Sequence, residues 1–241
     1  MRNAVYVLFA SSLAVMLVPI NIESISLSLT QPIYETLATY VIKKVRTDLL
    51  PPGVELLPMD WFAPFTVYMA VSIFLGAVIS SPVIIYEIYR FVGPALRRNE
   101  RRYIFLFTAS FSLLFLTGVL FGYLIVVPTT FRMLLASTLF LDLVPRYEFT
   151  SFFSLILGGL AMTGFMFTFP VFFVTLVKAG IVKTSLVTKA RRYLYAGLFI
   201  LIAITTPDPT ILSDVIIFLP VLLLTEASIV IGKRIEKARR S

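Results

Sequence analysis

The sequence predicts an all-α integral membrane protein with about six transmembrane helices, both termini in the cytoplasm and the last two helices short. Three observations support this. Of the 241 residues, 59% are hydrophobic and only 14% are charged, whereas a soluble domain carries about 25% charged residues. The apolar side chains gather in six runs, and the basic residues gather between alternate runs. A bilayer suits such a chain better than a soluble core, so we expect one membrane domain over residues 1–241.

The apolar runs give the expected spans. They are Ala4–Ile20, Phe62–Tyr89, Ile104–Val127, Phe149–Val177, Tyr193–Thr206 and Thr210–Gly232. The second, third and fourth runs exceed the roughly 20 residues that cross the hydrocarbon and can tilt. The fifth run would reach only about 21 Å as a helix, short of the roughly 30 Å core. Pro207-Asp208-Pro209 follows it at once, which predicts a tight, short hairpin with the sixth run.

The basic residues orient these spans. If the two termini and the loops after the second and fourth runs share one side, that side holds 16 of the 21 lysines and arginines. Cytoplasmic loops carry such an excess, so we expect both termini in the cytoplasm of a multi-pass cell-membrane protein. The net charge of +8 therefore indicates topology and not nucleic acid. We interpret the first run as a retained span, because the residues after Pro19 do not form a small-residue cleavage site.

The stretch between the first two runs is the longest outside the membrane. Pro32 can open a helix, and the apolar residues behind it follow helical spacing. We therefore predict an amphipathic helix over Pro32–Arg46 on the outer surface, ended by Pro51-Pro52-Gly53.

Composition also limits the chemistry. The chain has no cysteine and no histidine, which removes disulfides, the commonest metal ligand and the commonest general base near neutral pH. No glycine-rich phosphate loop is present. We predict no cofactor, no metal site and no enzymatic activity.

The densest group of polar and aromatic residues follows the second run, from Ser81 to Arg102, where Gly93-Pro94 breaks the helix and one carboxylate lies in a basic turn. Here the chain resembles the TatC family of the twin-arginine protein translocase. The matching positions are Tyr86, Phe91, Pro94, Ala95, Leu96, Glu100 and Arg101. Further matches, covering roughly residues 60 to 234, are Asp60, Pro64, Phe65, Pro170, Thr205-Thr206-Pro207-Asp208 and Glu226.

The resemblance implies a receptor for the Arg-Arg pair of an export signal. A guanidinium can donate two parallel hydrogen bonds to a carboxylate, so Glu100 is the candidate receptor carboxylate. Phe91, Pro94 and Leu96 would shape the site, with Arg101 beside it. The alternative is that Glu100 only pairs with neighbouring arginines of a basic loop.

Two departures from the family pattern concern further site residues. Only Met1-Arg2-Asn3 precedes the first run, whereas the family carries a glutamate there that shares signal binding. Glu87 could supply this second carboxylate, or could pair with Arg90 or Arg102. Thr168 stands where many members place a mid-membrane glutamate, and could hydrogen-bond a neighbouring helix or its own backbone.

Glu226 is the most deeply placed ionisable group in the expected spans. It could extend toward Lys233 or Arg234, or it could line a signal or partner site within the bundle. Asp208 is expected as a turn or capping residue. The resemblance implies that Thr205 and Asp208 border the site for single-span partner subunits.

The function expected from the resemblance is a signal-peptide receptor subunit that exports folded proteins with the proton-motive force. The expected partners are twin-arginine signal peptides, single-span subunits of the TatA and TatB type in a multimeric complex, and the lipid bilayer. The alternative is a small-solute secondary transporter, although no internal repeat supports it. An intramembrane enzyme would need paired acids or a Ser/His pair, which we do not find.

Overall fold

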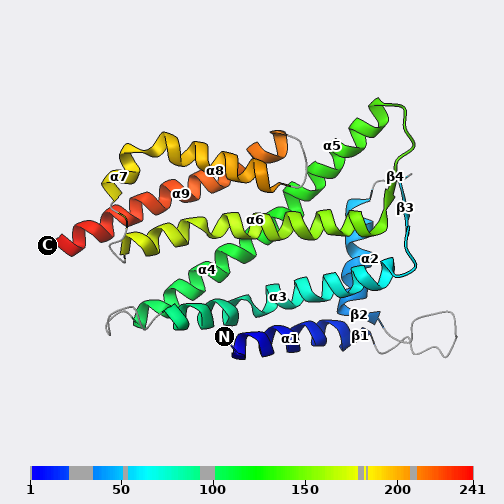
Figure 1. Ribbon diagram of the computed structural model, residues 1–241, viewed down its shortest axis with the longest axis horizontal. Helices are drawn as coiled ribbons and strands as arrows, with labels where there is room; N and C mark the ends of the chain where they lie inside the picture. The colour runs from blue at the N-terminus through cyan, green and yellow to red at the C-terminus, as the bar shows by residue number, and fades with distance from the viewer. Residues whose placement is uncertain are drawn as a thin grey trace. The chain divides into compact units, whose positions relative to one another are not determined.

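The computed structural model describes residues 2–21, 35–50, 54–92, 101–178, 182, 184–206 and 211–240. Most of them are helical (Figure 1). The chain divides into two compact units: Met1–Ile104 with Leu135–Leu157, and Phe105–Leu134 with Gly158–Ser241.

In the first unit, helix α1 (Arg2–Leu17) lies antiparallel beside α3 (Ala63–Val92) (Figure 1). Gly76 permits this close contact, because a Cβ there would lie 2.7 Å from the Cα of Ser12. The hydroxyl of Ser11 donates a hydrogen bond to the Gly76 carbonyl at 2.9 Å. Near the other end of the pair, the hydroxyl of Tyr68 donates to the carbonyl of Met16. Both polar contacts therefore join a side chain to a backbone oxygen.

Helix α2 (Leu37–Leu49) is amphipathic, as expected, but it starts later than the predicted Pro32. Ala38, Val45 and Leu49 are buried on one side of it. Glu35 and Thr36 form a strand, and the hydroxyl of Thr36 accepts a hydrogen bond from the backbone N–H of Thr39 at 3.3 Å. The N-cap preference of threonine thus sets the start of the helix. Residues 32–34 and 51–53 lie outside the described residues.

Two short ribbons were not predicted. β1 (Pro19–Asn21) pairs antiparallel with β2 (Glu35–Thr36). β3 (Glu55–Leu57) pairs in parallel with β4 (Arg146–Glu148), with Glu55 opposite Arg146 and Leu57 opposite Glu148. Strands of two or three residues carry too little pattern to detect from sequence. The β3–β4 ribbon joins the segments that lead into α3 and α6, and the β1–β2 ribbon joins the end of α1 to the start of α2.

The third apolar run continues well beyond its predicted end at Val127. Helix α4 (Arg101–Phe121) passes through a π-helical turn, η3 (Gly122–Val126), into α5 (Val127–Phe140). Pro128 lacks an N–H, and its ring would crowd the carbonyl one turn earlier in a regular α-helix. The wider turn, with the N–H of Val127 bonded to the carbonyl of Gly122, precedes this proline and lets the helix continue.

Helix α6 (Phe149–Lys178) packs against α4 in the second unit through small residues. A Cβ on Gly118 would lie 2.7 Å from the carbonyl oxygen of Thr163 and 2.9 Å from the Cα of Gly164. A Cβ on Gly122 would meet the Thr163 hydroxyl. The spacing of Gly118 and Gly122 therefore serves close helix packing.

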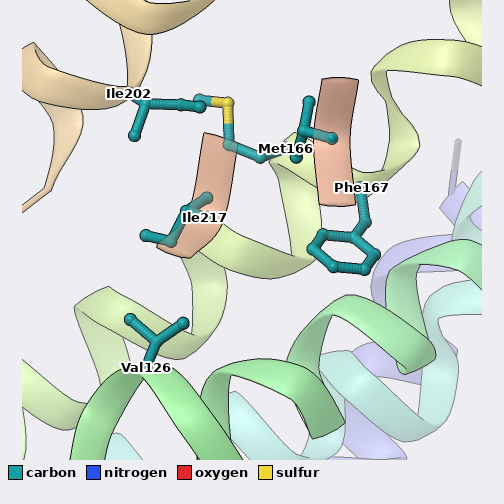
Figure 2. Close-up of a cluster of buried hydrophobic side chains, with 6 residues drawn as sticks. Val126, Met166, Phe167, Ile202 and Ile217 are labelled. Atoms are coloured by element: carbon teal, nitrogen blue, oxygen red, sulfur yellow. The ribbon is translucent and has the colours of Figure 1, made fainter. Parts of the chain in front are cut away.

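Helices α7 (Thr184–Lys189) and α8 (Arg191–Thr205) lie along α9 (Ile211–Arg240) (Figure 1). The core of this unit joins side chains from η3, α6, α8 and α9 (Figure 2): Val126, Met166, Phe167, Ile202, Ile217 and Val221. Helix α7 was not predicted, and α9 runs past the expected end at Gly232.

Among the described residues, four helices are long and apolar enough to cross a membrane. They are Ala63–Ile88, Phe107–Phe140, Phe149–Val177 and Ile211–Lys237. Helix α1 is apolar but shorter, and α8 has 15 residues. The predicted helical membrane protein is confirmed at this level, and the count of six spans stays a prediction.

Candidate functional site

The first candidate carboxylate lies near the end of α3. The side-chain amide of Asn3, at the start of α1, donates a hydrogen bond to Oε1 of Glu87 at 3.4 Å. Glu87 is half-buried. This contact fixes the start of α1 beside the last turns of α3, which lead into the basic segment.

The other predicted signal-binding residues cannot be placed in full. Pro94, Leu96 and Glu100 lie outside the described residues. Phe91 belongs to α3 and Arg101 opens α4, and only their backbones are described. The assignment of these residues to signal binding stays a prediction.

Glu226 pairs with Arg191, a partner that the sequence did not suggest. Nη2 of Arg191 lies 3.3 Å from Oε2 of Glu226, and the two side chains are 39% and 35% exposed. Arg191 opens α8 and Glu226 lies in the middle of α9, so the pair joins the two helices. The Nε of Arg191 is buried and has no hydrogen-bond partner among the described residues. Lys233 and Arg234, the expected partners, lie about two helical turns further along α9.

A second polar contact joins the C-terminal end of α8 to the first turn of α9. The hydroxyl of Thr206 donates a hydrogen bond to Oδ1 of Asp214 at 2.6 Å, and Asp214 is only 7% exposed. The neighbouring Ser213 lies 3.2 Å, hydroxyl to hydroxyl, from Thr130 of α5. Asp214 lies in the first turn of α9, where a carboxylate also interacts favourably with the free N–H groups.

Asp214 is the residue that the sequence reasoning undervalued. It was visible as an acid in the sixth run but received no role. The available signal was the Thr205-Thr206 pair, since a tight turn brings the end of one helix to the first turn of the next. Asp208 lies outside the described residues, and Thr205 is placed by its backbone alone as the last residue of α8.

The chain after α6 is tied to α9 by a third carboxylate. Oε2 of Glu236 accepts a hydrogen bond from the backbone N–H of Thr184 at 3.1 Å and another from the Thr184 hydroxyl. The Cβ that Gly232 lacks would lie 3.2 Å from Cγ2 of Thr184. Helix α7 therefore packs on the last turns of α9, which extend beyond the predicted end at Gly232.

Thr168 hydrogen-bonds its own helix. Its hydroxyl donates to the carbonyl of Phe165 at 2.7 Å, and the residue is 1% exposed. Of the two roles left open by the sequence, the backbone contact is present. In the described part of the chain, no group of three or more acidic residues gathers in a way that could hold a metal ion.

Comparisons with known proteins place this architecture in a family. The family model described as "Sec-independent protein translocase protein (TatC)" matches residues 1–220. The Sec-independent protein translocase protein TatC of Aquifex aeolicus is 32% identical over 200 residues, covering 81% of this chain and 82% of that protein. The Escherichia coli K12 protein of the same name is 29% identical over 197 residues, covering 82% of this chain and 74% of that protein.

A solved structure agrees with the sequence matches. The crystal structure described as "Twin Arginine Translocase Receptor- TatC" superposes with a TM-score of 0.73 at 28% identity, covering 98% of this chain and 95% of that one. The sequence matches and the structural superposition thus identify the same family. The chain belongs to the TatC family of Sec-independent protein translocase proteins, as the resemblance in its loops predicted.

Proposed function

We propose that this protein is the receptor subunit for twin-arginine signal peptides in a translocase that exports folded proteins across the cytoplasmic membrane with the proton-motive force. The observation that carries the proposal is its fold: it matches, over nearly the whole chain, a structure described as a twin arginine translocase receptor. A membrane protein of a translocase family that lacks histidine and cysteine suits a binding and transport role.

The proposed binding site is the basic segment between α3 and α4. Glu100 would accept the bidentate hydrogen bonds of a signal arginine. Phe91, Pro94 and Leu96 would form its apolar side, and Arg101 would lie beside the carboxylate. Glu87 would supply the second carboxylate. Its hydrogen bond with Asn3 supports this role, because the bond places Glu87 beside the first turn of α1 and close to the basic segment in sequence.

The proposed topology has six spans and both termini in the cytoplasm. Helix α1 completes the first span by packing along α3, and α8 completes the fifth by packing along α9. The excess of lysine and arginine on one side supports the orientation.

The proposed partners in the membrane are single-span subunits of the TatA and TatB type. Helix α8 reaches only about 22 Å, and a short hairpin favours local thinning of the bilayer. Thr205 and Asp208 would border the partner at one end of the hairpin. Glu226 and Thr168 would contribute from the span interior, with Glu226 held by Arg191.

Export in cells tests the whole proposal. The gene would replace the resident TatC gene of a bacterium, and export of a folded reporter would be measured with an Arg-Arg or a Lys-Lys signal. We expect export of the Arg-Arg reporter only, its loss when a protonophore collapses the proton-motive force, and a strong reduction for Glu100→Gln.

A matched control separates signal binding from general damage. Glu55→Gln removes an exposed carboxylate on β3, whose pairing with Arg146 at 3.6 Å is a surface contact, and we expect it to export normally. Equal export of both reporters by the wild type would contradict the receptor role, provided the protein reaches the membrane in normal amount.

A further inference from the structure

A strongly exposed apolar cluster lies at the end of α5 and in the turn that follows it. It comprises four large side chains around one turn: Phe140, Leu141, Leu143 and Val144, with exposed fractions of 88%, 64%, 57% and 73%. We call these four residues the α5 tip. A soluble surface rarely carries so dense an apolar group without a binding role.

The α5 tip is a formed structure. Asp142 adopts a left-handed conformation with φ 55°. Its N–H bonds to the carbonyl of Leu139 at 3.1 Å, and the N–H of Leu143 bonds to the carbonyl of Thr138 at 3.1 Å. This pair of bonds is the Schellman arrangement that ends a helix. The cap sets the backbone of the tip with its four apolar side chains exposed.

The neighbouring helices place this turn at a membrane boundary. The apolar helix that ends at Phe140 has 34 residues, and the next one starts at Phe149. The first would be about 51 Å long, and a tilt of about 30° would fit it to the roughly 40–45 Å that a bilayer spans with its headgroups. Only eight residues, 141–148, join these two apolar helices, so the tip cannot lie far from the headgroups.

A second apolar segment lies in the same unit. β3 and β4 run in parallel, and each precedes a candidate span. Trp61 and Phe62, just before α3, are 97% and 70% exposed. An aromatic residue directly before a span is typical of the headgroup region.

We propose that the α5 tip, together with Trp61 and Phe62, inserts into the headgroup and acyl-chain boundary of the leaflet on the β3–β4 side and anchors that end of the protein. The partner is the lipid surface itself. The apolar ends of two spans continue without interruption into these segments, and the only charge among residues 139–144 is Asp142. The expected depth is that of interfacial helices, about 5–10 Å. This proposal does not depend on the receptor role.

The single tryptophan of the chain makes a direct test possible. The full chain would be reconstituted in vesicles of phosphatidylcholine and phosphatidylglycerol whose acyl chains carry bromine either near the headgroup or near the methyl end. Quenching would be measured for wild-type Trp61 and for the double variant Trp61→Phe, Phe140→Trp. We expect the shallow bromines to quench both tryptophans more than the deep bromines do, and aqueous iodide to quench both weakly.

A control in the same background is Arg46→Trp, at an exposed position of α2, where we expect iodide to quench strongly and bromine weakly. If the tryptophan introduced at position 140 behaved like this control, the tip would lie in water and the proposal would be wrong. If neither quencher reached it, the tip would be covered by a second copy or another protein, which also overturns the lipid proposal. Wild-type Trp61 needs no substitution, so the test does not depend on the variant folding.

Discussion

Two pairs of helices in this protein combine a short helix with a long one, and they are held together differently. Along most of its length, helix α1 packs on α3 through the absence of a side chain at Gly76 and through hydroxyls that donate to backbone carbonyls. Its first turn also reaches a carboxylate, through the long hydrogen bond of 3.4 Å from Asn3 to Glu87. The α8–α9 pair is joined by side chains that include carboxylates, Asp214 at one end and Glu226 further along. The close approach of α1 to α3 therefore depends on the space at Gly76, whereas the packing of α8 on α9 depends on polar side-chain contacts.

This difference matters because both short helices are proposed to complete a span. Helix α1 would tolerate the loss of a hydroxyl but not the gain of a methyl group. The α8–α9 pair would tolerate an added methyl group but would be destabilised by the loss of a polar partner. A carboxylate that loses its partner in an apolar setting has no water to replace it.

The largest effect is expected for Gly76→Ala. The new Cβ would lie 2.7 Å from both the Cα and the N of Ser12, so α1 would have to move away, at a cost of about 2–3 kcal/mol. The measurement is the free energy of unfolding in mixed detergent micelles. The matched control is Gly197→Ala in α8, where no atom lies within 4 Å of the added Cβ, and we expect no loss there. Equal losses at both glycines would refute the shape limit.

The second effect concerns Asp214→Ala, which removes the charged acceptor of the Thr206 hydroxyl and leaves it only carbonyls of its own helix, the nearer being that of Ile202 at 3.0 Å. Because Asp214 is 7% exposed and its bond to Thr206 is charge-assisted, we expect a loss of about 1.5 kcal/mol in the same assay. Asp214→Asn keeps an oxygen acceptor and should lose less than half as much. If the two variants were equally unstable, the hydrogen bond to Thr206 would not be the cause.

The third effect is the coupling between Arg191 and Glu226. A double-mutant cycle with Arg191→Gln and Glu226→Gln should give about 1 kcal/mol, since the pair is partly exposed and therefore screened. The comparison pair is Lys44–Asp48 on α2, an i,i+4 pair at 3.2 Å within one helix whose lysine is 56% exposed, for which about 0.3–0.5 kcal/mol is expected. A coupling no larger than that of the α2 pair would show that Arg191 and Glu226 do not hold α8 on α9.

The smallest effect is expected at two adjacent serines of α1. Ser11→Ala removes the bond to the Gly76 carbonyl and should cost about 0.5 kcal/mol. Ser12→Ala removes a buried hydroxyl that has no partner among the described residues, so stability should be unchanged or slightly higher. A loss above about 1.5 kcal/mol for Ser11→Ala would exceed the usual contribution of one such bond and would contradict the shape-limited account.

The sequence predicted the helical architecture well because apolar runs are long-range signals. Helices α3, α6 and α8 lie within a few residues of their predicted runs. The errors came from local chemistry. The helix continues through the π-turn before Pro128, beyond the predicted end of the apolar run at Val127. The cap at Thr36 sets a helix start later than the predicted Pro32.

The polar residues of the candidate site can be recognised in the sequence, but the partners that they contact are harder to predict. The sequence identifies Glu226 as the most deeply placed ionisable group of the expected spans. Its partner Arg191 is 35 residues earlier and could be found only from the packing of α8 on α9. Asp214 was present in the predicted hairpin without an assigned role, because its value depends on the position of Thr206 across the turn. Periodicity identifies faces of helices and does not identify pairs across them.

The proposed receptor role requires that a carboxylate between α3 and α4 distinguishes arginine from lysine in a signal peptide. The most direct measurement is the affinity of detergent-solubilised protein for Arg-Arg and Lys-Lys peptides, compared between wild type, Glu100→Gln and Glu55→Gln. We expect the wild type and Glu55→Gln to prefer Arg-Arg, and Glu100→Gln to lose at least about tenfold in Arg-Arg affinity, as for a charge-assisted pair. Unchanged Arg-Arg preference in Glu100→Gln would contradict the claim.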